Sequence, residues 1–330
     1  MAIWTDATGE APIKEYPLVA EYDMTVADGK LVDQTGNGFD ATLQNFEEAD
    51  ITSENSDAVL VFDGKDNYVE LPAGMIQTEQ FAIEATFKTS VAANSWLWSL
   101  GTKVGSWPNV TNYVFVSPNF KDTTSIRAGI KDAETEKLFE NAGSIAMDTY
   151  TTIRMEFDKG EMKLLVDGDV VSTMSTDYSI QEILEAGTTD GICGFIGKST
   201  YSPDPLFTGT ITDFKVYAVA PTDYSALQAA VDAENAKELD GTQYNEGTWN
   251  AYTTALANAK AVLADPAATQ GAVDSALKEQ TEAVEELALK TKYTEANIAP
   301  FGTASADYTN NTGPTTGAMN DVLSLVLTHP

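Results

Sequence analysis

Cysteine and histidine are almost absent from this chain of 330 residues, and their scarcity excludes several kinds of chemistry. Cys193 is the single cysteine, so no disulfide can form within the chain. It lies in the apolar stretch GICGFIG, which favours a buried, inert thiol over a nucleophile. His329 is the single histidine, which excludes His-based triads and His-rich zinc sites within the chain. Any catalysis would have to depend on carboxylates, lysine or tyrosine.

Long apolar runs and basic side chains are also scarce. No run approaches the ~18 apolar residues of a membrane-spanning helix, and the opening MAIWTDATGE lacks the basic patch and apolar core of a signal peptide. Residues 1–16 indicate a lead-in or linker, so we expect an internal piece of a longer protein. The 19 basic and 50 acidic side chains give a formal net charge of −31. That charge repels nucleic acid and anionic membrane surfaces, but not a neutral glycan or a cation.

Residues 17–220 consist mainly of short segments in which polar and apolar residues alternate. Clusters of Asp, Gly, Asn and Pro separate these segments and favour turns. Such alternation over about 200 residues, without a βαβ rhythm, predicts an all-β antiparallel sandwich of the jelly-roll type. The segments are DAVLVFDG, NYVELP, FAIEATFKT, SWLWSLG, NYVFVSP, SIRAGI, YTTIRMEFD, EMKLLVDG and FTGTITDFKVYAV.

The composition changes at Pro221, and residues 221–290 predict a separate all-α bundle of three antiparallel helices. The first helix, within TDYSALQAAVDAENAKEL, has Thr222 or Asp223 available as its N-cap. The second, within TWNAYTTALANAKAVLAD, has Thr248 as its expected N-cap, and the third lies in TQGAVDSALKEQTEAVEELAL. The aromatic and leucine stripes of these helices are typical of a packed core and do not indicate a cofactor site.

The stretch EFDKGE, residues 156–161, contains the carboxylates of Glu156, Asp158 and Glu161. Glycoside hydrolases use paired carboxylates as acid and nucleophile, so a small glycosidase is one interpretation. The alternative is a hairpin, because Asp-Lys-Gly-Glu has the composition of a tight turn between two alternating segments. A catalytic motif would instead need an uninterrupted strand that points its carboxylates into a cleft. We favour the hairpin and expect no catalysis from this chain.

Four ordered stretches of residues 17–220 resemble the laminin-G-like, concanavalin A-like jelly-roll modules of bacterial extracellular proteins. They are AEYDMTVADGKLVDQTGNGFDATL, LVFDGKDNYVELP, the hairpin IRMEFDKGEMKLLVDGDVV and the closing FTGTITDFKVYAVA. The resemblance implies a structural calcium ion that joins an early loop to the last strand. Its ligands would be Asp33 and Asn37 in the loop and Asp213 in the strand, since hard cations bind carboxylate and carbonyl oxygens. The alternative is that Asp33 caps a turn and Asp213 is a solvated strand residue.

The helical region resembles the FIVAR module of Gram-positive surface enzymes in YNEGTWNAYTTALANAKAVLADPAATQGAVDSALKEQTEAVEEL. The following NIAPFGTASADYTN resembles the first strand of a discoidin-like carbohydrate-binding module. Residues 291–330 would then be a linker and a truncated stub of that module. The order of modules is similar to ancillary tails of secreted bacterial glycoside hydrolases. It implies an extracellular or cell-wall-associated location in a Gram-positive bacterium.

A glycan-binding surface needs exposed aromatic rings beside amides or carboxylates, because sugar C–H faces stack on rings while hydroxyls bond to polar neighbours. Trp107 and Asn109 in VGSWPNVTNY, and Tyr201 in STYSPDP, lie in stretches rich in turn-forming residues. We predict that these three residues contact a ligand. Trp96 and Trp98 lie in the strand-like SWLWSLG, where we expect less exposure.

The leading interpretation is a non-catalytic ancillary region of a multidomain glycoside hydrolase. The jelly roll would bind a neutral oligosaccharide or polysaccharide, or pack on an adjacent catalytic domain, and the helical bundle would act as a spacer. A second interpretation is a structural or adhesive cell-surface module that binds protein or no ligand. The third is the glycosidase that uses the EFDKGE carboxylates.

Overall fold

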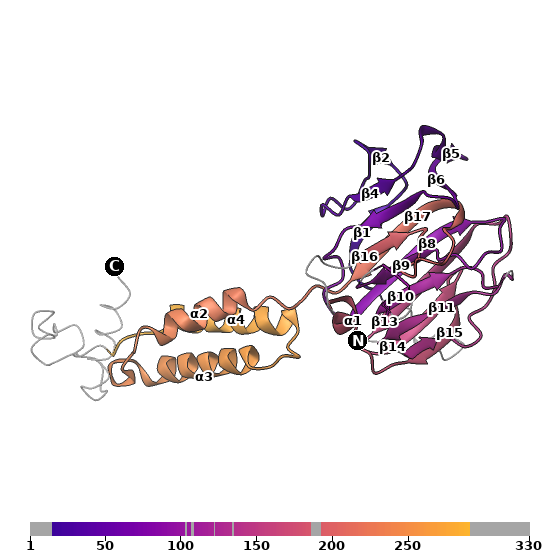
Figure 1. Cartoon of the computed structure of the whole chain (residues 1–330). Coiled ribbons are helices and arrows are strands. Elements are labelled where there is room, and N and C mark those ends of the chain that lie inside the picture. The colour runs from indigo at the N-terminus through magenta and orange to yellow at the C-terminus, as the bar shows by residue number, and fades with distance from the viewer. Residues whose placement is uncertain are drawn as a thin grey trace, which may run out of the picture. The chain divides into compact units, whose positions relative to one another are not determined.

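The computed structural model describes residues 15–102, 104–106, 109–121, 123–133, 135–185 and 193–290. The chain divides into two compact units between Pro221 and Thr222. The first unit is a β-sandwich and the second a bundle of three α-helices, which confirms the expected pair of an all-β and an all-α unit (Figure 1). The expected discoidin-like stub and His329 lie outside the described residues.

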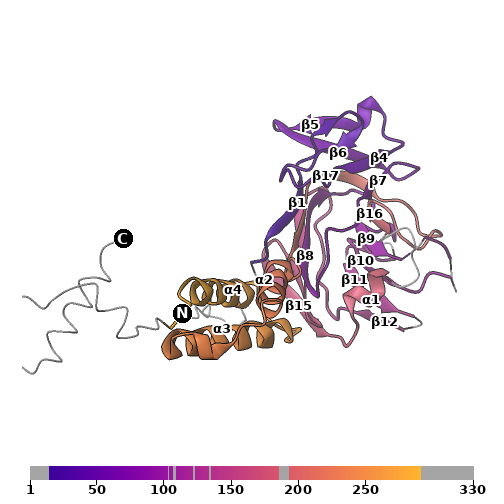
Figure 2. The same ribbon diagram turned by 90° about the vertical axis from the view of Figure 1, so that its left-hand side faces the viewer.

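One layer of the sandwich, which we call sheet 1, has the strand order β15-β14-β13-β8-β17-β6-β5, with β1 also paired to β17 (Figure 2). All of its pairs are antiparallel. Its strands are β1 (Leu18–Tyr22), β5 (Ile51–Glu54), β6 (Asp57–Asp63), β8 (Gln80–Lys88), β13 (Thr151–Asp158), β14 (Glu161–Val166), β15 (Asp169–Ser175) and β17 (Thr208–Ala218).

The other layer, sheet 2, has the order β12-β11-β10-β9-β16-β7-β4-β3-β2 and is also antiparallel. A short 3₁₀-helix, η1 (Glu48–Asp50), precedes β5, and the short helix α1 (Ile180–Glu185) was not predicted from the alternating pattern. The strands of sheet 2 are β2 (Val26–Ala27), β3 (Lys30–Leu31), β4 (Ala41–Gln44), β7 (Tyr68–Leu71), β9 (Trp98–Gly101), β10 (Tyr113–Ser117), β11 (Arg127–Asp132), β12 (Thr135–Leu138) and β16 (Cys193–Ile196).

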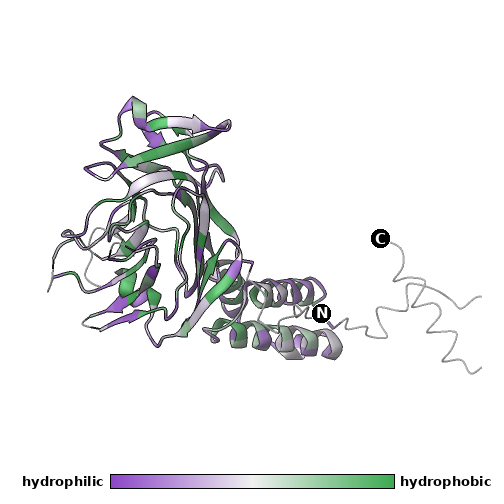
Figure 3. Cartoon of the chain, turned by 90° about the vertical axis from the view of Figure 1, so that its right-hand side faces the viewer, coloured by the Kyte–Doolittle hydropathy of each residue, from purple (hydrophilic) through white to green (hydrophobic). Residues whose placement is uncertain are grey.

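Successive side chains of a strand point to opposite faces of its sheet, so in most strands one set lies between the two sheets and the other outside. Figure 3 shows hydrophobic and hydrophilic residues along the strands of the sandwich. On β13, Ile153, Met155 and Phe157 pack in the main core, whereas Arg154 lies on the outer face. Helix α1 adds apolar side chains to the same core. Burial of apolar surface from both layers therefore stabilises the sandwich.

EFDKGE forms the two-residue hairpin that its composition predicts. Asp158 pairs with Glu161, and Lys159 and Gly160 between them have φ of 50° and 91°. A Cβ on Gly160 would lie 2.4 Å from the Thr176 carbonyl oxygen, so both φ and space require glycine. The motif is thus part of the scaffold that joins β13 to β14.

The second unit consists of α2 (Ser225–Asn235), α3 (Glu246–Leu263) and α4 (Gln270–Glu285), with a short 3₁₀-helix η2 (Gly241–Gln243) between α2 and α3. Their apolar faces meet in a small core that includes Leu227, Val231 and Ala259. In the described part of the chain, no helix has the length and apolar character that crossing a membrane would require.

The N-cap expected at Thr248 is wrong, because α3 begins at Glu246 and its N-cap lies three residues before Thr248. Asn245 is the N-cap, and its side chain accepts a hydrogen bond from the Gly247 N–H at 3.0 Å. Thr248 lies in the first turn and donates its hydroxyl to the Asn245 carbonyl at 3.2 Å. Asn and Thr are both good N-caps, so composition did not distinguish them.

Candidate functional site

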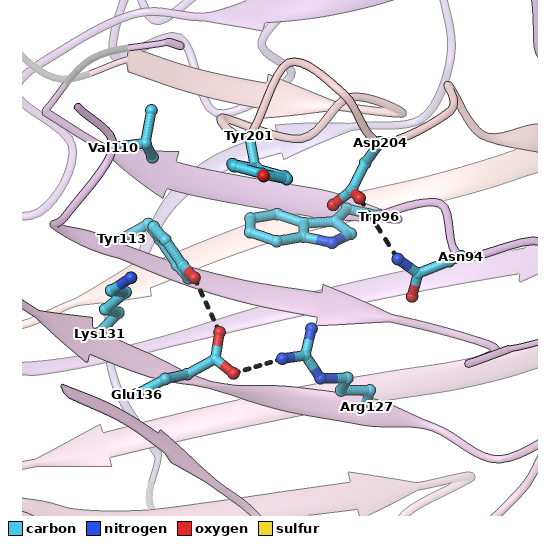
Figure 4. A pocket seen from close by; sticks show the side chains of 9 residues that line it. All are labelled: Asn94, Trp96, Val110, Tyr113, Arg127, Lys131, Glu136, Tyr201 and Asp204. Atoms are coloured by element: carbon cyan, nitrogen blue, oxygen red, sulfur yellow. Dashed lines mark hydrogen bonds and ion pairs between the residues drawn. The ribbon is translucent and has the colours of Figure 1, made fainter. Parts of the chain in front are cut away.

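A pocket of about 370 Å³ lies on the outer face of sheet 2 (Figure 4). Val114 and Val116 of β10 pack between the sheets, so Tyr113 and Phe115, which alternate with them, point outward. These outward rings form a second, smaller apolar cluster with Trp96. The pocket is therefore built on sheet strands, which hold its floor in place.

The floor of the pocket is aromatic. The Trp96 ring stacks on Phe115 with centroids 4.1 Å apart and planes at 22°, and it meets Tyr113 at 5.1 Å. Tyr201 packs against the same cluster from the loop between β16 and β17, and this loop is bridged to Gly105 (Figure 4). Trp96, Phe115 and Tyr113 are themselves buried, so the half-buried Tyr201 ring that packs on them is the aromatic face on which a sugar ring could stack.

Ion-paired side chains line one side of the pocket. Glu136 of β12 accepts a hydrogen bond from the Tyr113 hydroxyl at 2.7 Å and forms an ion pair with Arg127 of β11. The Arg127 guanidinium also lies 5.1 Å from the Phe115 ring centroid. Burial raises the pKa of Tyr113, and the charge of Glu136 raises it further, so this hydroxyl stays a hydrogen-bond donor. Arg127 and Glu136 are thereby fixed in orientation before any ligand binds.

Asp204 and Asn94 line the opposite side (Figure 4). The Asn94 amide donates to Asp204 Oδ1 at 3.3 Å, and the Ser199 hydroxyl donates to Oδ2 at 3.3 Å. Burial raises the pKa of Asp204, although the hydrogen bond from Ser199 opposes the shift. Within the described residues, Asn94 Oδ1 and Trp96 Nε1 are buried without a hydrogen-bond partner. Both the charged and the neutral polar groups here suit hydroxyl-bearing ligands.

Two family models match separate parts of the chain. Residues 63–225 match the family described as the concanavalin A-like lectin/glucanases superfamily, and residues 223–288 match the FIVAR domain. The chain carries a concanavalin A-like module followed by a FIVAR domain. Both families were expected from the sequence, and both are confirmed. A search among curated proteins finds no match.

Similar solved structures include carbohydrate-active proteins. One is Domain 4 of AbnA, a GH43 extracellular arabinanase from Geobacillus stearothermophilus, in complex with arabinotriose. Its sequence is 18% identical to this chain, and the match covers 62% of this chain and 93% of that domain with a TM-score of 0.49. Trypanosoma rangeli sialidase in complex with the inhibitor DANA is 16% identical, with 66% and 33% covered and a TM-score of 0.44, so the match spans a third of that enzyme. The CBM40 of Ruminococcus gnavus IT-sialidase, bound to alpha2,3 sialyllactose, is 19% identical, with 42% and 76% covered and a TM-score of 0.34.

The three residues predicted to bind a ligand have different positions in the concanavalin A-like module. Tyr201 is half-buried and lines the pocket. Asn109 is exposed and precedes Val110, which lines the pocket. Trp107 lies outside the described residues. Contact of these residues with a ligand stays a prediction.

Trp96 is one of several pocket residues that the sequence did not single out. Leu97 and Trp98, although adjacent, both pack in the main core of the concanavalin A-like module, so strict alternation fails just before β9. Trp96 therefore lies on the outer face, although it is only 1% exposed. The pattern W-L-W predicts a shared face for both tryptophans, and no feature of the segment signals the irregularity.

The three carboxylates of EFDKGE have separate structural partners. Glu156 is buried and accepts a hydrogen bond from Arg154 Nε at 2.9 Å, and Asp158 accepts one from the Gln80 amide at 2.8 Å. Glu161 is exposed and accepts one from the Ser175 hydroxyl at 2.9 Å. None of the three lines either of the two described pockets.

Asp33, the first expected calcium ligand, is buried in the loop after β3. Its carboxylate accepts hydrogen bonds from the backbone N–H groups of Glu21, Thr35 and Phe39 at 3.0–3.2 Å, and from the Thr35 hydroxyl. Burial opposes ionisation, but these hydrogen bonds outweigh it and hold the pKa of Asp33 below its ordinary value. Asn37, the second expected ligand, is exposed nearby in sequence. The Asp33 carboxylate thus serves as a turn acceptor, as the alternative interpretation expects.

Asp213, the third expected calcium ligand, forms an ion pair with Lys215, whose ammonium lies 3.1 Å from Asp213 and 3.3 Å from Glu21. Burial raises the pKa of Asp213, and Lys215 opposes that shift. Across the described ranges, no group of three or more His, Cys, Asp or Glu side chains could hold a metal ion. The side chains therefore form no metal-ligand set, and the calcium ion stays a prediction.

Proposed function

We propose that the concanavalin A-like module binds an uncharged oligosaccharide at the sheet 2 pocket. The observation that carries this proposal is the half-buried Tyr201 ring, which packs on the buried Trp96 and lies between two groups of hydrogen-bonding side chains. In a typical saccharide site, aromatic rings stack on sugar C–H faces, and nearby carboxylates and amides hydrogen-bond to the sugar hydroxyls. The pocket volume of about 370 Å³ falls within the range of pockets that bind small ligands.

The charges favour a neutral saccharide over an acidic one. Two acidic side chains, Glu136 and Asp204, balance two basic ones, Arg127 and Lys131. Arg127 is engaged by Glu136, so its charge is already compensated. The formal charge of −31 adds a long-range repulsion of anions.

The module would serve as a non-catalytic ancillary region of a secreted glycoside hydrolase, with the FIVAR domain as a spacer. The order of the two modules, a concanavalin A-like module followed by a FIVAR domain, supports the proposal that the chain is an ancillary region of such an enzyme. The separate partners of Glu156, Asp158 and Glu161 support the absence of catalysis. Hydrolysis of a glycan by this chain that disappears in Glu156→Gln would overturn the non-catalytic assignment.

The test is calorimetric titration of the whole chain with arabinotriose, maltotriose, cellotriose and, as an acidic comparator, 3′-sialyllactose. We expect at least one neutral trisaccharide to bind, and Tyr201→Ala to weaken it about tenfold or more, since a stacking residue at a binding centre contributes about 2 kcal/mol. Tyr178→Ala, outside both described pockets, is the matched control and should leave affinity unchanged. Absence of binding across neutral glycans would favour a structural or adhesive module instead.

Saccharide affinity should also depend on pH through Asp204. Burial raises the pKa of this carboxyl above its ordinary value, so protonation begins at a higher pH than for a solvated aspartate. The ionised form accepts ligand hydroxyls with both oxygens, so affinity should be constant well above this pKa and fall as pH decreases through it. We expect about a tenfold loss between about pH 7 and pH 4, measured by titration. Asp204→Asn should bind weakly at both pH values, and an unchanged pH profile in that variant would contradict the assignment.

A further inference from the structure

A second pocket, of about 420 Å³, lies on the outer face of sheet 1, on the other side of the sandwich from the first. Its strand residues include Glu84 of β8, Arg154 of β13 and Tyr217 of β17. They point outward because their neighbours Ile83, Ala85, Ile153, Met155 and Val216 pack between the sheets. None of the residues that line it belongs to the first pocket.

Two tyrosines and a buried leucine give this second pocket its apolar surface. Tyr16 precedes β1 and is only 8% exposed, so it packs over the sheet instead of extending into solvent. Its hydroxyl lies 3.4 Å from the Phe157 carbonyl oxygen. Leu165 turns to the outer face at an irregularity in the pairing of β14 with β15, and it is 1% exposed. The pocket therefore needs the last residues before β1 as well as the sheet.

The Arg154 guanidinium lies beside one of these tyrosine rings and is held in place by ion pairs. The Arg154 guanidinium lies 4.6 Å from the Tyr217 ring centroid, and it contacts Glu156 at 2.9 Å and Glu84 at 3.5 Å. Burial raises the pKa of Tyr217, and Glu84 raises it further, so the hydroxyl remains neutral. Among the described residues, this hydroxyl makes no hydrogen bond. It is available both to donate and to accept.

The charges at this pocket exclude an anionic ligand. Glu15 and Glu84 line it, and Arg154 is ion-paired with Glu84 and Glu156, so the carboxylates at this pocket outnumber its one guanidinium. A phosphate or a sugar acid would meet net negative charge and an arginine that is already paired. The pocket instead suits an uncharged sugar. Its carboxylates and tyrosine hydroxyl can hydrogen-bond to sugar hydroxyls, and its tyrosine rings can pack on the apolar C–H face of the sugar ring.

We infer that this sheet 1 pocket is a second saccharide site, which binds one end of an uncharged oligosaccharide through Tyr16, Tyr217 and Glu84. It goes beyond the proposed function, because neither family match assigns ligand contact to this face. Two sites on opposite faces would let one module contact two glycan chains and raise its avidity for a polysaccharide surface.

The test is methyl-resolved NMR of the whole chain during titration with arabinotriose, maltotriose and cellotriose. Thr152 and Leu165 report on the sheet 1 pocket, and Val110 reports on the sheet 2 pocket. In Tyr201→Ala, which disables the sheet 2 pocket, the Thr152 and Leu165 signals should still shift with a neutral trisaccharide. Glu84→Gln should weaken that response about tenfold and Tyr217→Phe about fivefold, the sizes of a charged and a neutral hydrogen bond. Tyr178→Phe is the matched control and should change nothing.

The outcomes separate this inference from the proposed function. Shifts at Val110 without shifts at Thr152 and Leu165 would overturn the second site and leave the first intact. Shifts at Thr152 and Leu165 alone would support the second site and remove the first. If the response at Leu165 survives both Glu84→Gln and Tyr217→Phe at full strength, the proposed contacts are wrong.

Discussion

Replacing Asp33 by alanine should lower the free energy of unfolding by about 3 kcal/mol, as expected for a buried charged acceptor with several donors. The backbone N–H groups of Glu21, Thr35 and Phe39 and the Thr35 hydroxyl all lose this acceptor. Asp33 is 5% exposed, so water cannot fully replace the carboxylate. Urea unfolding of the whole chain measures the loss, and Asp57→Ala, at an exposed position, should change stability by less than about 0.5 kcal/mol.

The stability difference between the wild-type chain and Asp33→Ala should depend on pH. The folded chain holds the pKa of Asp33 below its ordinary value, so the ionised carboxyl stabilises the fold above the pKa of the unfolded chain. This stabilisation is lost as pH falls through the folded-state pKa. The difference should therefore shrink in acid, and a difference that stays constant down to strongly acidic pH would contradict this origin.

Melting temperatures of the wild-type chain, Asp33→Ala and Asp213→Ala, each measured in EDTA and in calcium, test the expected calcium ion. A turn acceptor stabilises the chain equally in EDTA and in calcium, whereas a metal ligand acts only when calcium is present. A calcium-dependent rise in melting temperature that Asp213→Ala removes would support the calcium site. Equal melting temperatures in EDTA and calcium would exclude it.

Replacing Arg154 by methionine should also cost about 3 kcal/mol, since removal of one partner of a buried ion pair leaves the other charge buried. The Arg154 and Glu156 side chains are 11% and 3% exposed, and Nε lies 2.9 Å from the carboxylate. Methionine keeps the volume of the stem but removes the cation that contacts Glu156. Lys65→Met, at the exposed ion pair with Asp63, should change stability by less than about 1 kcal/mol.

A second substitution shows whether the buried charge causes this loss. Adding Glu156→Gln to Arg154→Met should restore much of the stability, because the remaining side chain is neutral. If the double variant is as unstable as the sum of the single variants, lost packing is the cause instead.

Local patterns were sufficient to predict the longer strands of the first unit and the three helices of the second. Alternation in YTTIRMEFD and EMKLLVDG predicts the strands β13 and β14, and Lys159-Gly160 predicts the hairpin between them, since a two-residue turn with positive φ favours this composition. Apolar residues at helical spacing likewise predict α2, α3 and α4. The exceptions include the short strands β5, β12 and β16, the helix α1, and two N-caps. The N-cap of α2 is Tyr224 and not Thr222 or Asp223, and that of α3 is Asn245 and not Thr248. These are short features whose local signals have several equivalent solutions.

The candidate site could be predicted only in part. Tyr201 is visible in the sequence because it lies in a loop beside Ser, Pro and Asp, and the structure places it in the pocket. Trp96, Glu136 and Arg127 were not identified, since each belongs to a separate segment that taken alone resembles ordinary strand sequence. Their proximity depends on which strands pair and in what register.

The sequence by itself determined the longer strands, the three helices of the second unit, the Lys159-Gly160 turn and the exclusion of cysteine and histidine chemistry, because these depend on composition and on residues close in the chain. Only the tertiary structure decided that Trp96 lies outside the main core, where an irregularity before β9 reverses the face that alternation predicts. It also decided that Glu156 is held by Arg154 on the outer face of sheet 1. Both outcomes depend on contacts between segments far apart in the chain, which a local period of two residues does not encode.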